Sequence, residues 1–389
     1  MDFQFHFSVP REFLDFFCVL PATAFTSFLD GSFSPSMDNA DSALIGTILA
    51  SYTLTALLTR PFSGFLVDYF SRKPLLVTCY FVFVGFFAGY IVAGTLLFFA
   101  ILRAVHGFSF GMVTVSNSTM AIDVMPSSRR NVGIGYYGLS TNIAMALSPT
   151  LSLFLHDNYG NYDYIFLCSL LTGTFGLICV SLIKAPEKIT SAGEPISLDR
   201  FFLLKGIPAG INIALLSFIY GIMSTYVAIY GEQEVHIKSG TGFFFMLMAF
   251  GLITSRLLSA GQMNRGHLTR TILLGILFMI TGFSCFIFLK TIHFFYLSAF
   301  LIGMSYGFVC PAFQAMFINL ARHNQRGTAN STYLTCWDIG LGAGVFLGGY
   351  IAKASNYTTA YLVGLGLVIL GLILFQTLTA SYYTRHKLR

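Results

Sequence analysis

Apolar runs long enough to cross a lipid bilayer follow one another along almost the whole chain. A membrane-spanning helix needs about 20 mostly apolar residues. Of the 389 residues only 10% are charged, 55% are hydrophobic, and the mean hydropathy is +0.74. A soluble protein of this length would carry far more charge. We therefore predict an all-α membrane protein with twelve transmembrane helices, at roughly 11–32, 42–66, 74–95, 96–121, 131–155, 162–184, 201–229, 239–261, 269–289, 291–318, 328–352 and 357–383.

The distribution of the 22 lysines and arginines predicts the orientation of the chain. Loops on the cytoplasmic side are enriched in these residues. Placing the N-terminus in the cytoplasm puts most of them in inner loops or at inner helix ends, and the C-terminus is then cytoplasmic as well. The formal net charge of +6 is a topology signal on this interpretation, so we expect no nucleic-acid partner.

The sequence repeats itself weakly at a spacing of 196 residues. This shift places Arg60 on Arg256 and Gly107 on Gly303, at equivalent points of corresponding runs. Two halves of six helices each then face the same way, related by an axis along the membrane normal. Two such bodies can rock about a shared interface and expose a central cavity to each side in turn. We predict an N-terminal bundle at 1–184, a cytoplasmic linker at 185–200 and a C-terminal bundle at 201–389.

No motif for a metal, a nucleotide or a catalytic group stands out. The seven cysteines lie inside apolar runs and none has CxxC spacing, as expected of small packing residues. No GxxxxGK[ST] loop occurs, and no stretch is long enough for a soluble ATPase domain. No cleavable signal peptide is evident. We expect no cofactor, no metal and no enzymatic activity, with the energy supplied by an ion gradient or by the gradient of the substrate.

A short charged stretch, GFLVDYFSRK at residues 64–73, separates the second and third runs. It resembles the signature loop of the major facilitator superfamily of transporters, which reads G-x-L-x-D-R-x-G-R-R/K. Tyr69 and Ser71 depart from that pattern. The twelve-run, two-half layout extends the resemblance over the full chain and implies a transporter of that fold. The residues that match the loop pattern are Gly64, Leu66, Asp68, Arg72 and Lys73.

The same stretch has the chemistry of a conformational latch. Gly64 would let two helices pack closely at the membrane face. Asp68 can accept hydrogen bonds from the amides at a neighbouring helix N-terminus, where the helix dipole favours an anion. Arg72 can pair with Asp123, at the end of the fourth run. The resemblance implies that this group stabilises an outward-open state; alternatively, Arg72 and Lys73 only set the orientation of the chain.

The fourth run contains an arginine, Arg103, within RAVHGFSFG. This stretch is similar to the superfamily's fourth-helix motif R-x-x-Q-G-x-G, with His106 in place of the glutamine. At about 100° per residue, Arg103, His106 and Asn117 share one helix face, which we predict lines a coupling or substrate cavity. Arg103 would hold an anionic group or favour the ionised form of a nearby acid. The alternatives are an arginine bonded to backbone carbonyls and a histidine that hydrogen-bonds without titrating.

Two acids inside predicted helices are candidates for proton binding. Asp15 lies early in the first run and Asp338 near the middle of the eleventh. An acid at the middle of the membrane is expected to bind a proton or a cation. Asn142 occupies the position of Asp338 in the other half of the repeat, and we assign it to the same cavity. The alternatives are a capping role for Asp15 and a buried hydrogen bond for Asp338.

The fifth run carries ALSPTLS, which resembles the G-P-x-x-G element of the proton-coupled antiporter branch of the superfamily. Pro149 is kept, and Ser148 and Ser152 stand where the glycines would be. Proline bends or weakens a helix, and serine preserves a small contact surface. The element favours export over import.

These observations predict a proton-coupled exporter of small amphipathic molecules that works by alternating access. We expect a monomer in the inner membrane of a bacterium, with a small-molecule substrate, protons and the lipid bilayer as its partners. One alternative is a symporter or facilitator that imports a small nutrient such as a sugar or an organic acid. Another is a non-transporting receptor on a transporter scaffold.

Overall fold

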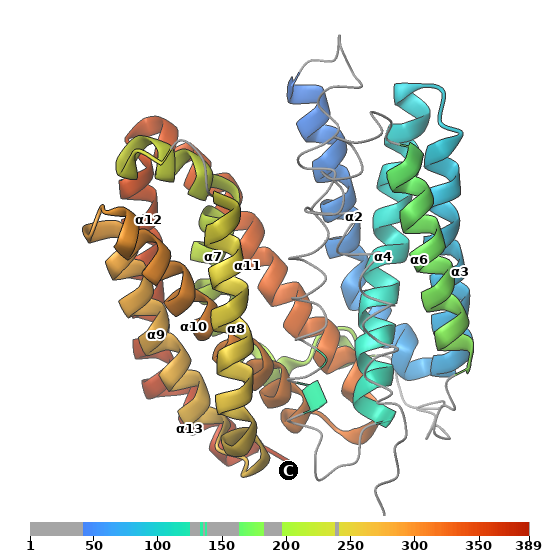
Figure 1. The fold of residues 1–389 in the computed structure, drawn as a ribbon. Helices are drawn as coiled ribbons and strands as arrows, with labels where there is room; N and C mark the ends of the chain where they lie inside the picture. Colours follow the sequence, from blue (N-terminus) through green and yellow to red (C-terminus); the bar gives the residue numbers. More distant parts are fainter. Residues whose placement is uncertain are drawn as a thin grey trace, which may run out of the picture. The chain divides into compact units, whose positions relative to one another are not determined.

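The structure of the protein, a computed structural model, describes residues 42–124, 133–134, 137, 163–182, 197–237 and 241–388. Within these ranges every regular element is a helix (Figure 1). Nine of the described helices are long and apolar enough to cross a membrane. The all-α, multi-pass architecture is therefore confirmed for this part of the chain. The number of twelve helices and the cytoplasmic termini stay predictions, because the first predicted run and most of the fifth lie outside the described residues.

The described residues group into two compact units. One unit takes those among 1–59, 70–125 and 136–189, and the other takes those among 60–69, 126–135 and 190–389. Helix α2 (Ser42–Tyr69) therefore begins in the first unit and ends in the second. Its last ten residues carry the first part of the predicted latch, so the contacts of that part are made within the second unit.

The first unit is built around α3 (Arg72–Ile91). This helix packs against both α4 (Leu96–Val124) and α6 (Asp163–Leu182), as Figure 1 shows. Aromatic and branched side chains from the three helices form its core, with Phe83 and Phe87 of α3 fully buried. The periodic burial of such side chains is what holds helices together once each has satisfied its own backbone.

The second unit is a bundle of helices that follows the end of α2. Its elements in chain order are η1 (Leu198–Arg200), η2 (Leu204–Gly206), α7 (Ile207–Val235), α8 (Thr241–Asn264), α9 (Leu268–Phe288), α10 (Ile292–Leu320), η3 (His323–Gln325), α11 (Arg326–Ala354), α12 (Tyr357–Leu374), the π-helical turn η4 (Phe375–Thr379) and α13 (Ala380–His386). Helix α10 packs between α8 and α9, and α11 packs along α7. Helix α12 covers α7, α9 and α11.

Glycine and proline residues mark irregular points of the helical backbone. Gly266, just after α8, has a φ of 74°, a left-handed conformation that glycine adopts without steric cost. The turn that it makes separates α8 from α9. Inside α2, Pro61 removes one backbone donor from the helical ladder, and it does so one residue after the chain passes from the first unit to the second.

The internal repeat is visible in the helix packing. A Cβ atom added to Gly111 of α4 would lie 2.8 Å from the carbonyl oxygen of Ala56 in α2. A Cβ atom added to Gly307 of α10 would lie 2.8 Å from the carbonyl oxygen of Leu252 in α8. The shift of 196 residues places each member of the first pair on the corresponding member of the second. The two halves therefore use the same close glycine contact between equivalent helices.

Large apolar side chains remain exposed along the helices. Phe81 of α3 is 67% exposed and Phe346 of α11 is 76% exposed, and many leucines and isoleucines behave in the same way. A soluble protein rarely leaves contiguous apolar surface of this kind, whereas a lipid-facing helix needs it. The exposure pattern agrees with the hydropathy of the spans.

Glycine-mediated packing between α7 and α11 gives a test of the fold. A Cβ atom at Gly344 would lie 2.8 Å from the carbonyl carbon of Phe218 and 3.1 Å from its Cα atom. Because backbone atoms cannot move aside, we expect Gly344→Ala to destabilise the protein by about 1–3 kcal/mol. Thermal unfolding of the detergent-solubilised protein would show a lower midpoint.

Gly342, on the same helix, is the matched control. A Cβ atom there meets nothing within 4 Å, so Gly342→Ala should leave the midpoint unchanged or raise it, since alanine favours helix by about 1 kcal/mol over glycine. Equal midpoints for the two variants would contradict the close α7–α11 packing.

Candidate functional site

The carboxylate of Asp68, at the end of α2, caps the N-terminus of α11. Its Oδ1 accepts a hydrogen bond from the Gly327 N–H at 2.8 Å, and its Oδ2 accepts one from the Thr328 N–H at 2.7 Å. The Thr328 hydroxyl lies 2.9 Å from Oδ2 and 2.8 Å from the carbonyl oxygen of Arg200, so its single proton serves one of them at a time. Asp68 is almost fully buried, and the dipole of α11 favours an anion at this position. The helix N-terminus that the sequence predicts for Asp68 is that of α11.

Two glycines allow the backbones of α2 and α11 to approach closely beside this cap. A Cβ atom at Gly64 would lie 2.7 Å from the Cβ atom of Ser331 and 2.9 Å from the Cα atom of Thr328. A Cβ atom at Gly327 would lie 2.8 Å from the carbonyl oxygen of Gly64. The Ser331 hydroxyl donates to the carbonyl oxygen of Arg60 one turn further along α2. A single added methyl group would separate the two helices here.

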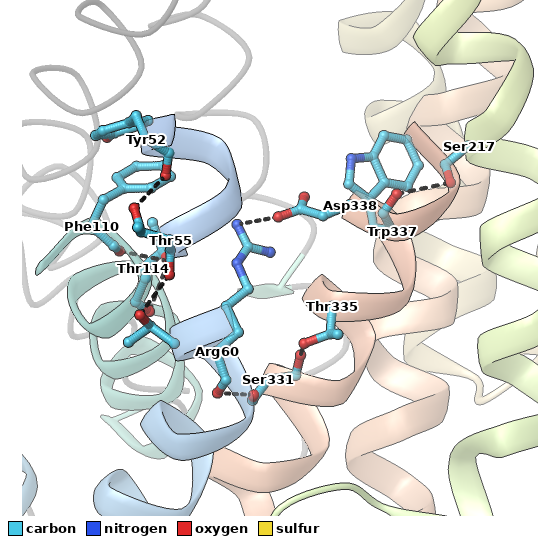
Figure 2. A network of polar contacts seen from close by, with 12 residues as sticks. Tyr52, Thr55, Arg60, Phe110, Thr114, Ser217, Ser331, Thr335, Trp337 and Asp338 are labelled. Atoms are coloured by element: carbon cyan, nitrogen blue, oxygen red, sulfur yellow. Dashed lines mark hydrogen bonds and ion pairs between the residues drawn. The ribbon is translucent and has the colours of Figure 1, made fainter. Parts of the chain in front are cut away.

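An ion pair lies at the other end of the same contact. Nη2 of Arg60 is 3.0 Å from Oδ2 of Asp338, and the two side chains are 6% and 18% exposed (Figure 2). Residues spaced by three or four along a helix share one face, so the pair continues the row that begins at Asp68. We call this row the α2–α11 interface; it consists of Arg60, Gly64, Asp68, Gly327, Thr328, Ser331 and Asp338.

Residues just before α7 are held against this interface. The ring of Phe201 stacks on the ring of Phe65 in α2, with their centroids 4.7 Å apart. The guanidinium of Arg200 lies 5.0 Å from the centroid of the same Phe65 ring. Asp199 accepts a hydrogen bond at 2.9 Å from the side-chain amide of Gln325, which directly precedes α11. The chain that enters the C-terminal helices therefore contacts both partners of the interface.

The remaining residues of the predicted latch lie in the first unit. Arg72, at the start of α3, forms an ion pair with Asp123, near the end of α4, and both are largely buried. Lys73 is half-buried. The structure thus brings Arg72 and Asp123 together as a pair that joins α3 to α4, while Gly64 and Asp68 belong to the α2–α11 interface.

The arginine of the fourth run packs inside the first unit. Arg103 is 2% exposed, and its guanidinium lies 4.2 Å from the centroid of the Tyr52 ring in α2. A cation over an aromatic face is stabilised by the ring quadrupole, more strongly when it is desolvated. Arg103 therefore connects α4 to α2, in addition to the hydrogen bond of 2.8 Å that the Thr55 hydroxyl donates to the carbonyl oxygen of Ala104.

His106 is fully buried among aromatic rings. Its Nδ1 lies 2.9 Å from the hydroxyl of Tyr90, and its ring centroid is 4.6 Å from that of Phe83 and 5.0 Å from that of Phe86. This apolar environment favours the hydrogen-bonding alternative for His106 over proton binding. Asn117, which lies on the same predicted face of α4, is 2% exposed. Its side-chain nitrogen is 3.4 Å from the hydroxyl oxygen of Tyr137.

Three aromatic rings cluster at Trp337, the residue before Asp338. The ring centroid of Tyr220 is 4.9 Å from that of Tyr306 and 5.5 Å from that of Trp337, and the last two are 5.8 Å apart. Figure 2 shows Trp337 next to Asp338, with the Ser217 hydroxyl donating to the Trp337 carbonyl oxygen at 2.9 Å. We call these three rings the aromatic triad. The sequence analysis missed Tyr220 and Tyr306, since nothing in an apolar run distinguishes them from other packing aromatics.

Several predicted site residues lie outside the described residues, and their roles stay predictions. They are Asp15, Asn142, Ser148, Pro149 and Ser152.

Of the acids that the structure describes in these contacts, Asp338 is the one suited to change its partner. Asp68 is bound by backbone amides, and Asp123 by the buried Arg72. Asp338 is more exposed and is paired to the side chain of Arg60. A carboxylate in this setting can exchange a guanidinium for a proton or a cation. No group of three or more potential metal ligands occurs among the residues described.

Comparison with known proteins gives consistent matches over the length of the chain. The Major Facilitator Superfamily profile matches residues 16–345 and 269–387. The Staphylopine export protein of Staphylococcus aureus is 23% identical over 352 residues, which cover 86% of this chain and 87% of that protein. The Quinolone resistance protein NorA of Staphylococcus aureus is 22% identical over 324 residues, which cover 80% of each.

Solved structures of the same architecture superpose well. The human organic anion transporter MFSD10 (TETRAN) gives a TM-score of 0.76 at 16% identity, covering 94% of this chain and 100% of that chain. The transporter FucP gives a TM-score of 0.77 at 13% identity, covering 95% of this chain and 98% of that chain. These likenesses concern the fold, while the family profile spans most of the sequence. The chain belongs to the Major Facilitator Superfamily of membrane transporters.

Proposed function

We propose that this protein is a proton-coupled exporter of small amphipathic molecules in the inner membrane of a bacterium. The observation that carries the proposal is the Arg60–Asp338 pair, an ion pair between two transmembrane helices at one end of the α2–α11 interface. An ionisable pair inside the membrane is costly to keep, and helix packing alone would not need it.

Proton binding at Asp338 gives the pair a role in alternating access. A protonated Asp338 is neutral, so Arg60 loses the charge that it pairs with, and the contact between α2 and α11 weakens at that end. When Asp338 loses the proton, its ion pair with Arg60 forms again and the whole α2–α11 interface is in contact. Because one partner of a buried pair is strongly destabilised when the other is neutralised, the proton and the closed interface compete.

Export is favoured over import by the relatives. The Staphylopine export protein and the Quinolone resistance protein NorA both cover four fifths or more of this chain. The aromatic triad beside Asp338 supports amphipathic substrates, because such rings offer a flat apolar surface with polar edges.

Flux measurements on Asp338→Asn test the coupling. We expect wild-type proteoliposomes with an imposed pH gradient to move a quinolone, an amphipathic aromatic molecule, against its own gradient. In Asp338→Asn, which cannot exchange a proton at this position, the response to the pH gradient should fall by about tenfold or more. Downhill exchange of the same probe should be reduced less, since substrate binding does not require the proton.

Glu232 supplies the matched control for this experiment. It is an exposed carboxylate near the end of α7, and Glu232→Gln should leave gradient-driven flux as in the wild type. Uptake driven equally well in wild type and Asp338→Asn would contradict the assignment of Asp338. Accumulation in the opposite direction, with the proton instead of against it, would favour the importer.

Amide exchange on Asp68→Asn tests the cap at the other end of the interface. Asparagine keeps one acceptor oxygen but loses the charge and the second oxygen, so one of the Gly327 and Thr328 amides loses its acceptor and the other keeps only a neutral one. We expect hydrogen exchange in the first two turns of α11 to accelerate by about tenfold, which corresponds to about 1.4 kcal/mol. Mass spectrometry of the peptides that cover these turns would measure the change.

Exchange elsewhere in the second unit provides the internal reference. Peptides from α9, which contributes no residue to the α2–α11 interface, should exchange at the wild-type rate. Unchanged exchange at the start of α11 would show that the amides are held without the carboxylate.

A further inference from the structure

A second buried arginine, Arg256 of α8, lacks the ion partner that Arg60 has. It is 6% exposed, and its Nε and Nη1 atoms are buried with no hydrogen-bond acceptor among the residues that the structure describes. It lies within the apolar span Gly242–Ser259. An ionised group in such a place is expensive unless an opposite charge reaches it.

The internal repeat explains why Arg256 lacks the acid that Arg60 has at the equivalent position. The shift of 196 residues places Arg60 on Arg256 and Asn142 on Asp338. The first arginine therefore pairs with a carboxylate, whereas the residue equivalent to that carboxylate in the other half is an uncharged amide. Among the residues that the structure describes, Arg256 therefore keeps the cation of the pair without the anion, so its charge can attract a negative group of a bound molecule.

The surroundings of Arg256 suit an aromatic ligand. Arg256 lies where α8 packs closely against α10, because a Cβ atom at Gly307 would lie 3.0 Å from the Cβ atom of Ser255, the residue before Arg256. Tyr306 of the aromatic triad directly precedes Gly307 and lies one helical turn before Cys310, so Arg256 and the triad lie at the same contact between α8 and α10. Tyr220, Cys310 and Trp337 are each partly exposed. The cluster thus combines flat apolar surface with a cation that has no ion partner among the described residues.

We propose that Arg256 binds the carboxylate, or a similar anionic group, of an aromatic substrate whose ring packs against the aromatic triad. A guanidinium matches a carboxylate with two parallel hydrogen bonds, and burial strengthens the attraction. Asp338 does not compete for this cation, because Arg60 already pairs with it. The inference rests on the proposed transport function and narrows its substrates to anionic or zwitterionic aromatic molecules.

Trp337 makes the proposal measurable without transport. It is the single tryptophan of the chain and part of the aromatic triad, so its fluorescence reports binding there directly. We would titrate the purified full-length protein in lipid nanodiscs with benzoate and with benzamide, which has the same shape but no charge. We expect the wild type to bind benzoate about tenfold more tightly than benzamide.

Variants of Arg256 test whether this residue causes the preference for benzoate over benzamide. Arg256→Gln should lose it while keeping the affinity for benzamide, and Arg256→Lys should retain a reduced preference, because lysine keeps the charge without the fork of donors. Arg265→Gln, an exposed arginine just after α8, should behave as the wild type. Thermal unfolding midpoints of all variants, and stabilisation of the wild type by benzoate, separate lost binding from lost folding.

The outcomes also separate this proposal from the coupling mechanism. Preference for benzoate that disappears in Arg256→Gln supports the anion site, even if no pH-driven flux is found. A wild type that binds neither probe, or that binds both equally, overturns the site, as does full preference in Arg256→Gln. Gradient-driven flux in that last case would leave the exporter intact and refute only the role of Arg256.

Discussion

A charge inside the hydrocarbon of a bilayer has no water to solvate it, so an ionised side chain on these helices needs a partner in the protein or in a bound molecule. This constraint fixes where α2 meets α11. Asp68 is satisfied by two backbone amides at the start of α11, and Arg60 by the carboxylate of Asp338 further along the same helix. Because the partners occupy one face of each helix, satisfying the charges also sets the register in which the two helices pack.

The two ends of the α2–α11 interface respond to different conditions. Backbone amides keep their polarity at every pH, whereas Asp338 can gain a proton. Between them, Gly64 and Gly327 hold the backbones so close that the contact cannot loosen by small steps; packed interfaces of this kind have discrete arrangements. Pro61, next to Arg60, already lacks one helical hydrogen bond. Weakening the Arg60–Asp338 pair therefore affects α2 at a point where the backbone already lacks one hydrogen bond.

Local chemistry could be predicted from the sequence, but the choice of partner often could not. The apolar runs place the described helices within a few residues, with two exceptions: α7 begins and ends six residues later than its run, and the last run covers α12, η4 and part of α13. The pairing of Arg72 with Asp123 follows from their equivalent positions at adjoining helix ends. The partner of Asp338 could not be predicted in this way, because Arg60 lies 278 positions earlier and only the tertiary fold brings the two residues together. His106 shows the same limit: its helix face is predictable, but the α3 rings that enclose it are not.

Duplication preserved the packing of the two halves more faithfully than their charges. Gly111 and Gly307 make equivalent contacts, since the helices of both halves must approach closely. In contrast, Asp68 corresponds to Asn264 and Asp338 to Asn142. A buried charge is retained only where a partner or a task offsets its cost, so the acids of the α2–α11 interface have no acidic equivalents in the repeat. Under the proposed coupling, a proton that binds at Asp338 would therefore weaken one contact and would have no matching acid to act on in the other half, and this difference would let a pH gradient influence the conformational cycle.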